Sequence, residues 1–240
     1  MALAFSTDKL KNDKLLIRNI EALETSGSLI DICVGKTFVL TNGVLKVEKL
    51  HIGSRFHKVD SPQINLQLFN FLADLIIMNT DARVEMSDND HKYVPCGNAI
   101  EVSLLNFLVG NNYAVQEQMI RRERTYKLEA KIPFSSDRKR LTVAYRIPES
   151  NIVRVVIKGA PEEIVRSCTR ERDSSNDVIS FDGNWSAGEN YLEKVVSDIA
   201  QIGLKPLTIA YRDFEVETFE ELQARFGNFE EEQGRKALES

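Results

Sequence analysis

Three stretches in the first half of the chain carry apolar residues at the spacing of an α-helix. They are residues 1–24, 65–80 and 98–109, and polar or charged residues separate the apolar ones in each. This pattern predicts amphipathic helices, with Gly27 ending the first of them. A fourth stretch with helical spacing, residues 189–201, lies towards the end of the chain. Trp185, shortly before it, is expected to pack near this helix rather than to serve as a platform for a ligand.

The middle of the chain changes to the two-residue alternation of β-strands. Residues 127–147 predict a long antiparallel hairpin connected through 134–140, and a third strand follows at 152–157. Shorter apolar runs that predict further strands lie at 29–33, 178–181 and 207–211. Antiparallel strands with helices before and after them indicate an α+β fold, with a central antiparallel β-sheet flanked by helices, rather than a doubly wound parallel sheet.

The composition is that of a folded, soluble chain. With 240 residues and 42% hydrophobic content, the chain is long enough for one sizeable core or two small ones. Its apolar stretches fall short of the roughly 20 residues of a membrane helix, and its first lysines follow the N-terminal apolar residues, unlike those of a signal peptide. The three cysteines and three histidines stand apart from one another, which predicts a reducing compartment and no metal site.

Charge is distributed unevenly along the chain, whose net charge is −5. Residues 121–158 are rich in arginine and lysine, whereas glutamates dominate after Asp213. A basic segment within an acidic protein favours a phosphate ligand over nucleic acid, because no nucleic-acid-binding module accompanies it. Residues 215–240 are expected to form an acidic tail, a solvated and partly disordered helix.

A lysine and a glycine, Lys158 and Gly159, directly follow the apolar strand 152–157. A lysine at that point can pack its stem while its ammonium group points outward, and glycine has no Cβ to keep a ligand away from the backbone. An anionic ligand is therefore a candidate. The segment also suits a plain strand-to-helix corner, in which Gly159 turns the chain and Pro161 begins the helix. The segment alone leaves both interpretations open.

Five segments occur in an order that resembles the P-type ATPase family. Residues 32–42 (ICVGKTFVLTN) are similar to the family's I-C-S-D-K-T-G-T-L-T-T/N motif, and residues 97–105 to its G-x-x-T-E-x-A-L-L element. Residues 132–141 look like its F-x-S/R-x-R-K-x-M segment, 158–162 like K-G-A-P-E, and 203–214 like the G-L-R-x-x-x-x-A-Y-R-D-F run of plasma-membrane calcium pumps. The resemblance implies a nucleotide-binding domain over 46–214, preceded in 1–45 by a stalk-like helix and the first strand of a phosphorylation domain.

The same resemblance implies an ATP site, occupied by Mg-ATP in the parent pump. Phe134 would stack on the adenine and Glu101 would accept a hydrogen bond from its amino group, while Lys139 and Lys158 would meet the triphosphate or line its pocket. The further site positions are Gly159, Ser136 and Lys205. Ser136 stands where the family sometimes has arginine, and Lys205 where it usually has arginine. The affinity for ATP should therefore be modest. Without the resemblance, Phe134 could be a core residue and Glu101 an exposed charge in the first turn of a helix.

Gly35 stands where the family has the aspartate that accepts the γ-phosphate. Glycine has no nucleophile, so the resemblance implies that this chain cannot form the phosphoenzyme and has no catalytic residue of its own. Val34, Phe38 and Val39 also differ from the family's serine, glycine and threonine, which favours divergence over a single inactivating change. A Walker A loop ending in Gly35-Lys36-Thr37 is disfavoured, because it requires glycine at the position of Ile30.

Two functional hypotheses follow. In the first, the chain is the ATP-binding cytoplasmic domain of a membrane-embedded calcium pump, either an excised segment or a truncated paralogue. Its partners would be ATP and the phosphorylation, actuator and membrane domains of the pump, and no nucleic acid. In the second, it is an interaction or regulatory module that has lost nucleotide binding as well as the aspartate. The presence of Phe134, Glu101, Lys139 and Lys158 favours the first.

Overall fold

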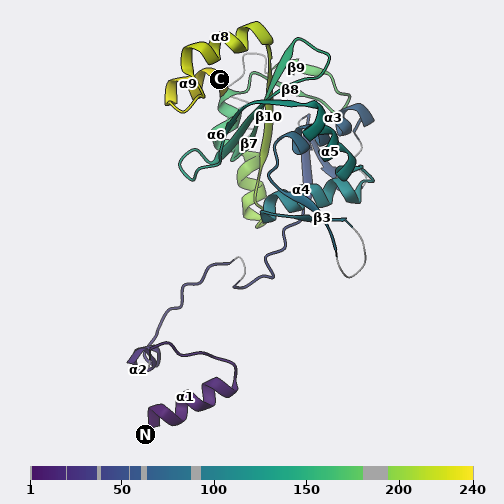
Figure 1. Ribbon diagram of the computed structural model, residues 1–240. Coiled ribbons are helices and arrows are strands. Elements are labelled where there is room, and N and C mark those ends of the chain that lie inside the picture. Colours follow the sequence, from purple (N-terminus) through teal and green to yellow (C-terminus); the bar gives the residue numbers. More distant parts are fainter. Residues whose placement is uncertain are drawn as a thin grey trace. The chain divides into compact units, whose positions relative to one another are not determined.

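The chain forms two units, Met1–Val44 and Leu45–Ser240, both drawn in Figure 1. The computed structural model describes residues 2–19, 21–36, 39–53, 55–60, 64–87, 93–180 and 194–239. Trp185, the first part of the expected helix 189–201, and Thr37 and Phe38 lie outside these ranges.

The first unit contains two helices, α1 (Ala2–Asn12) and α2 (Glu21–Ser26), joined by non-helical chain. The prediction of one continuous helix over 1–24 is therefore wrong. The strand predicted at 29–33 is also wrong, because these residues have no strand assignment and Ile30 is 94% exposed. A strand needs a neighbour for its backbone N–H and C=O groups, and the described residues of this unit contain no other strand with which to pair.

A four-stranded antiparallel sheet lies at the centre of the second unit (Figure 1). Its strands, in the order β10-β7-β6-β5, are β10 (Thr208–Glu215), β7 (Ile152–Gly159), β6 (Arg140–Arg146) and β5 (Lys127–Ile132). The valines of β7 are fully buried, and β-branched side chains of this kind favour the extended backbone. The predicted α+β fold with a central antiparallel sheet is confirmed.

One face of the sheet is covered by α3 (Leu66–Met78), which also packs with α4 (Ala99–Gly110) and α5 (Val115–Thr125). The sequence predicts α3 and α4 nearly to the residue. Both begin at an asparagine whose side chain accepts a hydrogen bond from the helix backbone, Asn65 from Gln67 N and Asn98 from Ile100 N, and such caps favour helix initiation. Residues of α3 that contact the sheet, Leu75 and Met78, pack against Val143 and Val156.

The opposite face of the sheet is covered by the acidic end of the chain, which is folded. Residues 216–239 form α8 (Val216–Phe226) and α9 (Glu232–Glu239). Phe219, Phe229 and Leu238 are fully buried and belong to the same hydrophobic cluster as Val153 and Val155 of β7. The prediction of a solvated, partly disordered tail is therefore wrong, because a few large apolar residues between the glutamates complete the core.

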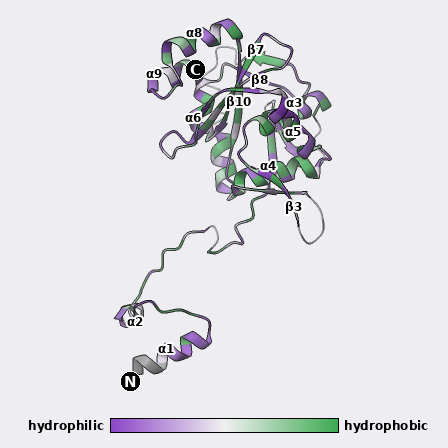
Figure 2. Ribbon diagram, viewed as in Figure 1, coloured by the Kyte–Doolittle hydropathy of each residue, from purple (hydrophilic) through white to green (hydrophobic). Residues whose placement is uncertain are grey.

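The remaining elements are short. They are the hairpins β1–β2 (Lys49–Ile52, Arg55–Lys58), β3–β4 (Arg83–Met86, Tyr93–Cys96) and β8–β9 (Arg170–Arg172, Val178–Ser180), the helical turns α6 (Pro161–Ile164) and η1 (Val165–Ser167), and a helix at 194–201. In Figure 2 the hydrophobic colour gathers within the second unit, at the central sheet and the helices packed on it. Among the described residues, no helix is both long and apolar enough to span a bilayer.

Candidate functional site

One end of the central sheet gathers the residues that the sequence singles out. Gly159 of β7 pairs with Arg140 of β6 on one side and with Thr208 of β10 on the other. The end of β5, the start of β6, the end of β7 and the start of β10 therefore meet at this end of the sheet. Phe134 follows β5, Lys139 precedes β6 and Lys205 precedes β10. The antiparallel register thus brings these three segments to the same end of the sheet as Lys158.

Lys158 and Glu101 form a buried ion pair beneath this end. The Lys158 Nζ lies 2.8 Å from Glu101 Oε1 and 2.5 Å from the carbonyl oxygen of Asn79, and the two residues are 6% and 8% exposed. The expectation that the Lys158 ammonium points outward is wrong, and so is the alternative that Glu101 is an exposed helix charge. The second oxygen of Glu101 accepts from Asp81 N at 3.2 Å. A carboxylate has about four lone-pair positions, so Glu101 retains acceptor capacity for a further donor.

Gly159 is the last residue of β7 and does not turn the chain. A Cβ at this position would lie 2.2 Å from the carbonyl oxygen of Lys139 and 2.7 Å from the Cα of Arg140. Glycine is therefore required by the close approach of β6 rather than by a turn. Pro161 begins α6, as the strand-to-helix corner predicts.

Phe134 and Lys139 are exposed to solvent in the connection between β5 and β6. Phe134 is 61% exposed, so the alternative that it belongs to the core is wrong. The Lys139 backbone has a φ of 51°, and its Nζ lies 3.8 and 4.0 Å from carboxylate oxygens of Glu162 and Glu163. Such long, exposed ion pairs contribute little, so the Lys139 ammonium can exchange these partners for a ligand.

The two other predicted positions, Ser136 and Lys205, are also exposed at this end of the sheet. Together with Phe134 and Lys139 they place an aromatic ring, a hydroxyl group and two ammonium groups on segments whose strands meet at this end of the sheet. The buried pair of Lys158 and Glu101 supplies polar atoms behind it. This arrangement suits a ligand that has both a flat ring and negative charge.

Glu239, at the end of α9, contacts two arginines at the end of the β5–β6 connection and the start of β6. The sequence gives no sign of this contact. The carboxylate oxygens of Glu239 lie 2.5 Å from Arg138 Nη2 and 2.7 Å from Arg140 Nη2. Both arginines are therefore held by a carboxylate about 100 positions further along the chain. No local pattern reveals this partnership.

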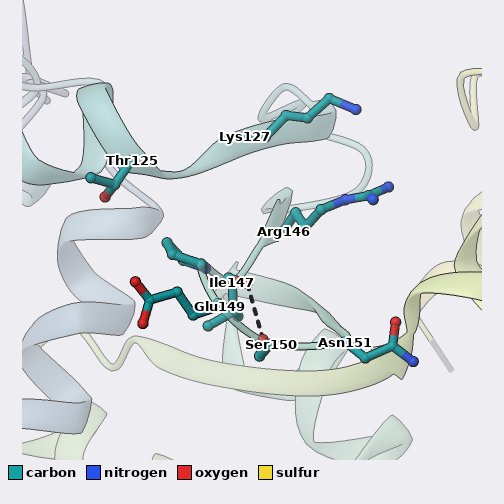
Figure 3. A pocket seen from close by; sticks show the side chains of 8 residues that line it. Thr125, Lys127, Arg146, Ile147, Glu149, Ser150 and Asn151 are labelled. Carbon is teal, nitrogen blue, oxygen red and sulfur yellow. Dashed lines mark hydrogen bonds between the residues drawn. The ribbon is translucent and has the colours of Figure 1, made fainter.

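A cavity of about 460 Å³ lies at the opposite end of the sheet (Figure 3). It is bordered by Thr125, Lys127 and the turn from Arg146 to Asn151, and Arg146 bonds Glu129 and Glu220 at 2.7 and 2.9 Å. A second cavity, of about 230 Å³, lies beside β3, β4 and the start of α5. Neither cavity is lined by a residue of the candidate site. Among the described residues, no group of three or more histidine, cysteine or acidic side chains is arranged to hold a metal ion.

The fold and the site define an α+β domain with an exposed aromatic and cationic surface at one end of its sheet. Residues 68–239 match the family of the P-type ATPase cytoplasmic domain N, and the chain belongs to this family. The matched range includes α8 and α9, which agrees with their place in the core.

The chain is similar to plasma-membrane-type calcium-transporting ATPases. It is 30% identical over 221 residues to putative calcium-transporting ATPase 7 of Arabidopsis thaliana, covering 90% of this chain and 21% of that protein. It is 30% identical over 225 residues to calcium-transporting ATPase 10 of Oryza sativa subsp. japonica, with coverage of 90% and 21%. For plasma membrane calcium-transporting ATPase 4 of Bos taurus the identity is 30% over 227 residues, with coverage of 89% and 18%. The chain thus spans about a fifth of the length of these relatives.

Proposed function

We propose that this chain is the ATP-binding domain of a calcium-transporting P-type pump and lies on the cytoplasmic side of its membrane. The observation that carries the proposal is the convergence of Phe134, Lys139 and Lys205 at the sheet end that covers the Lys158–Glu101 pair. The names of the relatives, all calcium-transporting ATPases, support the choice of nucleotide and of ion.

The exposed ring of Phe134 stacks on the adenine. Stacking of a base on an aromatic side chain is worth about 1–3 kcal/mol, and the 61% exposure of Phe134 leaves a ring face available. Glu101 accepts from the exocyclic amino group of adenine, which guanine lacks at that position. Lys158 holds the Glu101 carboxylate in position, because its Nζ donates to Glu101 Oε1 at 2.8 Å.

The exposed lysines contact the phosphates. Lys139 gives up its two long contacts with Glu162 and Glu163 for the stronger charge of the triphosphate. Lys205 adds a second mobile point charge, without the two-pronged contact that an arginine would make. Ser136 offers a hydroxyl donor in place of an arginine charge. The affinity should therefore be modest.

The chain does not phosphorylate itself. Gly35 has no side-chain oxygen to attack the γ-phosphate, so hydrolysis requires an aspartate on another domain. In the parent pump, the phosphorylation, actuator and membrane domains would be the partners, and Mg-ATP the form of nucleotide bound.

An NMR titration of the 240-residue chain with ATP tests the proposal. We expect backbone shifts that cluster at residues 134–139, 158–159 and 205, and none at the cavity beside Arg146. Absence of shifts at millimolar ATP would contradict the proposal and favour a module that has lost nucleotide binding. Incubation with γ-labelled ATP should leave no acid-stable phosphate on the chain, whereas labelled protein would contradict the role given to Gly35.

A further inference from the structure

A single buried carboxylate holds the connection that carries the candidate site residues. Glu239 is 8% exposed. Its Oε1 accepts from Arg138 Nη2 and Thr142 Oγ1, each at 2.5 Å, and its Oε2 accepts from Arg140 Nε at 2.8 Å. Hydrogen bonds between ionised groups are stronger than neutral ones, so Glu239 fixes the start of β6 from the face opposite α3.

The two arginines pass this constraint on to both sides of Lys139. Arg138 Nη1 donates to the carbonyl oxygen of Pro133 at 3.0 Å, which fixes the backbone directly before Phe134. Arg140 Nη1 donates to the carbonyl oxygen of Glu163 at 3.2 Å, which fixes the end of α6 that faces Lys139. The ring of Phe134 is itself mostly exposed, so its position depends on the backbone that carries it.

Attachment of α9 does not account for this network. Leu238, the neighbouring residue, is fully buried in the core cluster and secures the helix by apolar contact. Removing a carboxylate and two guanidinium groups from water is costly, and apolar residues in their place are often at least as stabilising. The network therefore does more than hold the helix, and its geometry leads from Glu239 to the backbone beside Phe134.

We propose that Glu239 is a positioning residue of the nucleotide site, acting through Arg138 and Arg140 to hold Phe134 and Lys139 in their binding arrangement. This rests on the proposed function, since it concerns the same site. Glu239 does not itself touch the nucleotide. Its contribution is to keep the exposed ring and ammonium group preorganised, so that binding does not have to order them.

The first test measures ATP affinity of the 240-residue chain carrying Glu239→Gln. The amide puts an NH₂ group against a guanidinium and removes the charge that holds both arginines, so we expect the dissociation constant to rise about tenfold. The matched control is Glu232→Gln on the same helix. Glu232 pairs with exposed Lys236 at 2.6 Å, and the control should bind as the unchanged chain does. An unchanged affinity in Glu239→Gln would overturn the inference.

A double-mutant cycle separates positioning from general stability. Because Glu239 is proposed to act on Phe134 as well as on Lys139, the loss caused by Glu239→Gln should be smaller than about tenfold in a Phe134→Ala background. The same tenfold loss in both backgrounds would overturn the inference, because a general loss of folding does not depend on Phe134. Should Glu239→Gln not fold, Arg138→Lys serves in its place, since it keeps a cation for Glu239 but lacks the fork that also reaches Pro133. Failure of the unchanged chain to bind ATP would refute the proposed function instead, and is seen before any variant is made.

Discussion

Replacement of Lys158 by methionine tests the buried ion pair at the centre of the site. Methionine keeps the unbranched stem but removes the ammonium group. Among the described residues, Glu101 then keeps its hydrogen bond from the N–H of Asp81, and the buried carbonyl oxygen of Asn79 loses its bond from Lys158. Removing one partner of a buried pair costs about 3–5 kcal/mol, because the remaining charge is stranded. We expect a decrease of this size in the free energy of unfolding, measured by urea denaturation and circular dichroism.

Two further variants give this measurement its controls. Adding Glu101→Gln to Lys158→Met removes the stranded charge and should restore part of the loss. Lys205→Met replaces an exposed lysine at the same end of the sheet and should change the stability by less than about 0.5 kcal/mol. A loss of under about 1 kcal/mol for Lys158→Met would refute the reasoning, since that is the value of an exposed pair.

Three other predictions concern the core, the sheet and pH. Phe219→Ala should cost about 3–5 kcal/mol of stability in urea denaturation, because Phe219 is fully buried; a change within about 0.5 kcal/mol would mean that the acidic end is solvated after all. Gly159→Ala should cost about 1–3 kcal/mol and shift the NMR signals of Lys139 and Arg140, whose backbone its Cβ would meet; unchanged signals would contradict this. The pKa of Tyr113 is raised by burial and by its hydrogen bond to Asp74. The stability it contributes is present below its ordinary pKa of about 10 and is lost as pH rises above that value. The urea midpoint should therefore fall more steeply between about pH 9 and pH 11 than it does in Tyr113→Phe, and equal slopes would contradict the assignment.

The spacing of apolar residues and the helix caps predict the helices and strands that depend mainly on nearby sequence. The helices α3 and α4 have asparagine caps and apolar stripes, the strands β5 and β6 have alternation, and β7 is rich in valine. The burial of α8 and α9 against the sheet is not predicted, because their glutamates dominate the composition while Phe219, Phe229 and Leu238 decide the packing. The strand expected at 29–33 is apolar enough, but pairing depends on neighbours that the described residues do not include.

The site shows the same division. The motifs propose the positions of the candidate site along the chain, because each motif is a short local segment. Which atoms meet could not be named, because contacts depend on register and on distant residues. The pairing of Lys158 with Glu101, 57 positions apart, turns an expected surface cation into a buried one. The contact of Glu239 with Arg138, 101 positions apart, has no signal in either local sequence.

ATP affinity of Phe134→Ala, compared with the unchanged chain, tests the central claim most directly. Loss of a stacking contact worth about 1–3 kcal/mol should raise the dissociation constant about 5- to 150-fold. Phe56→Ala is the matched control, since Phe56 is also an exposed phenylalanine but lies on β2, outside the candidate site, and it should bind ATP as the unchanged chain does. Equal affinities in Phe134→Ala and the unchanged chain would contradict the claim that this end of the sheet binds the nucleotide.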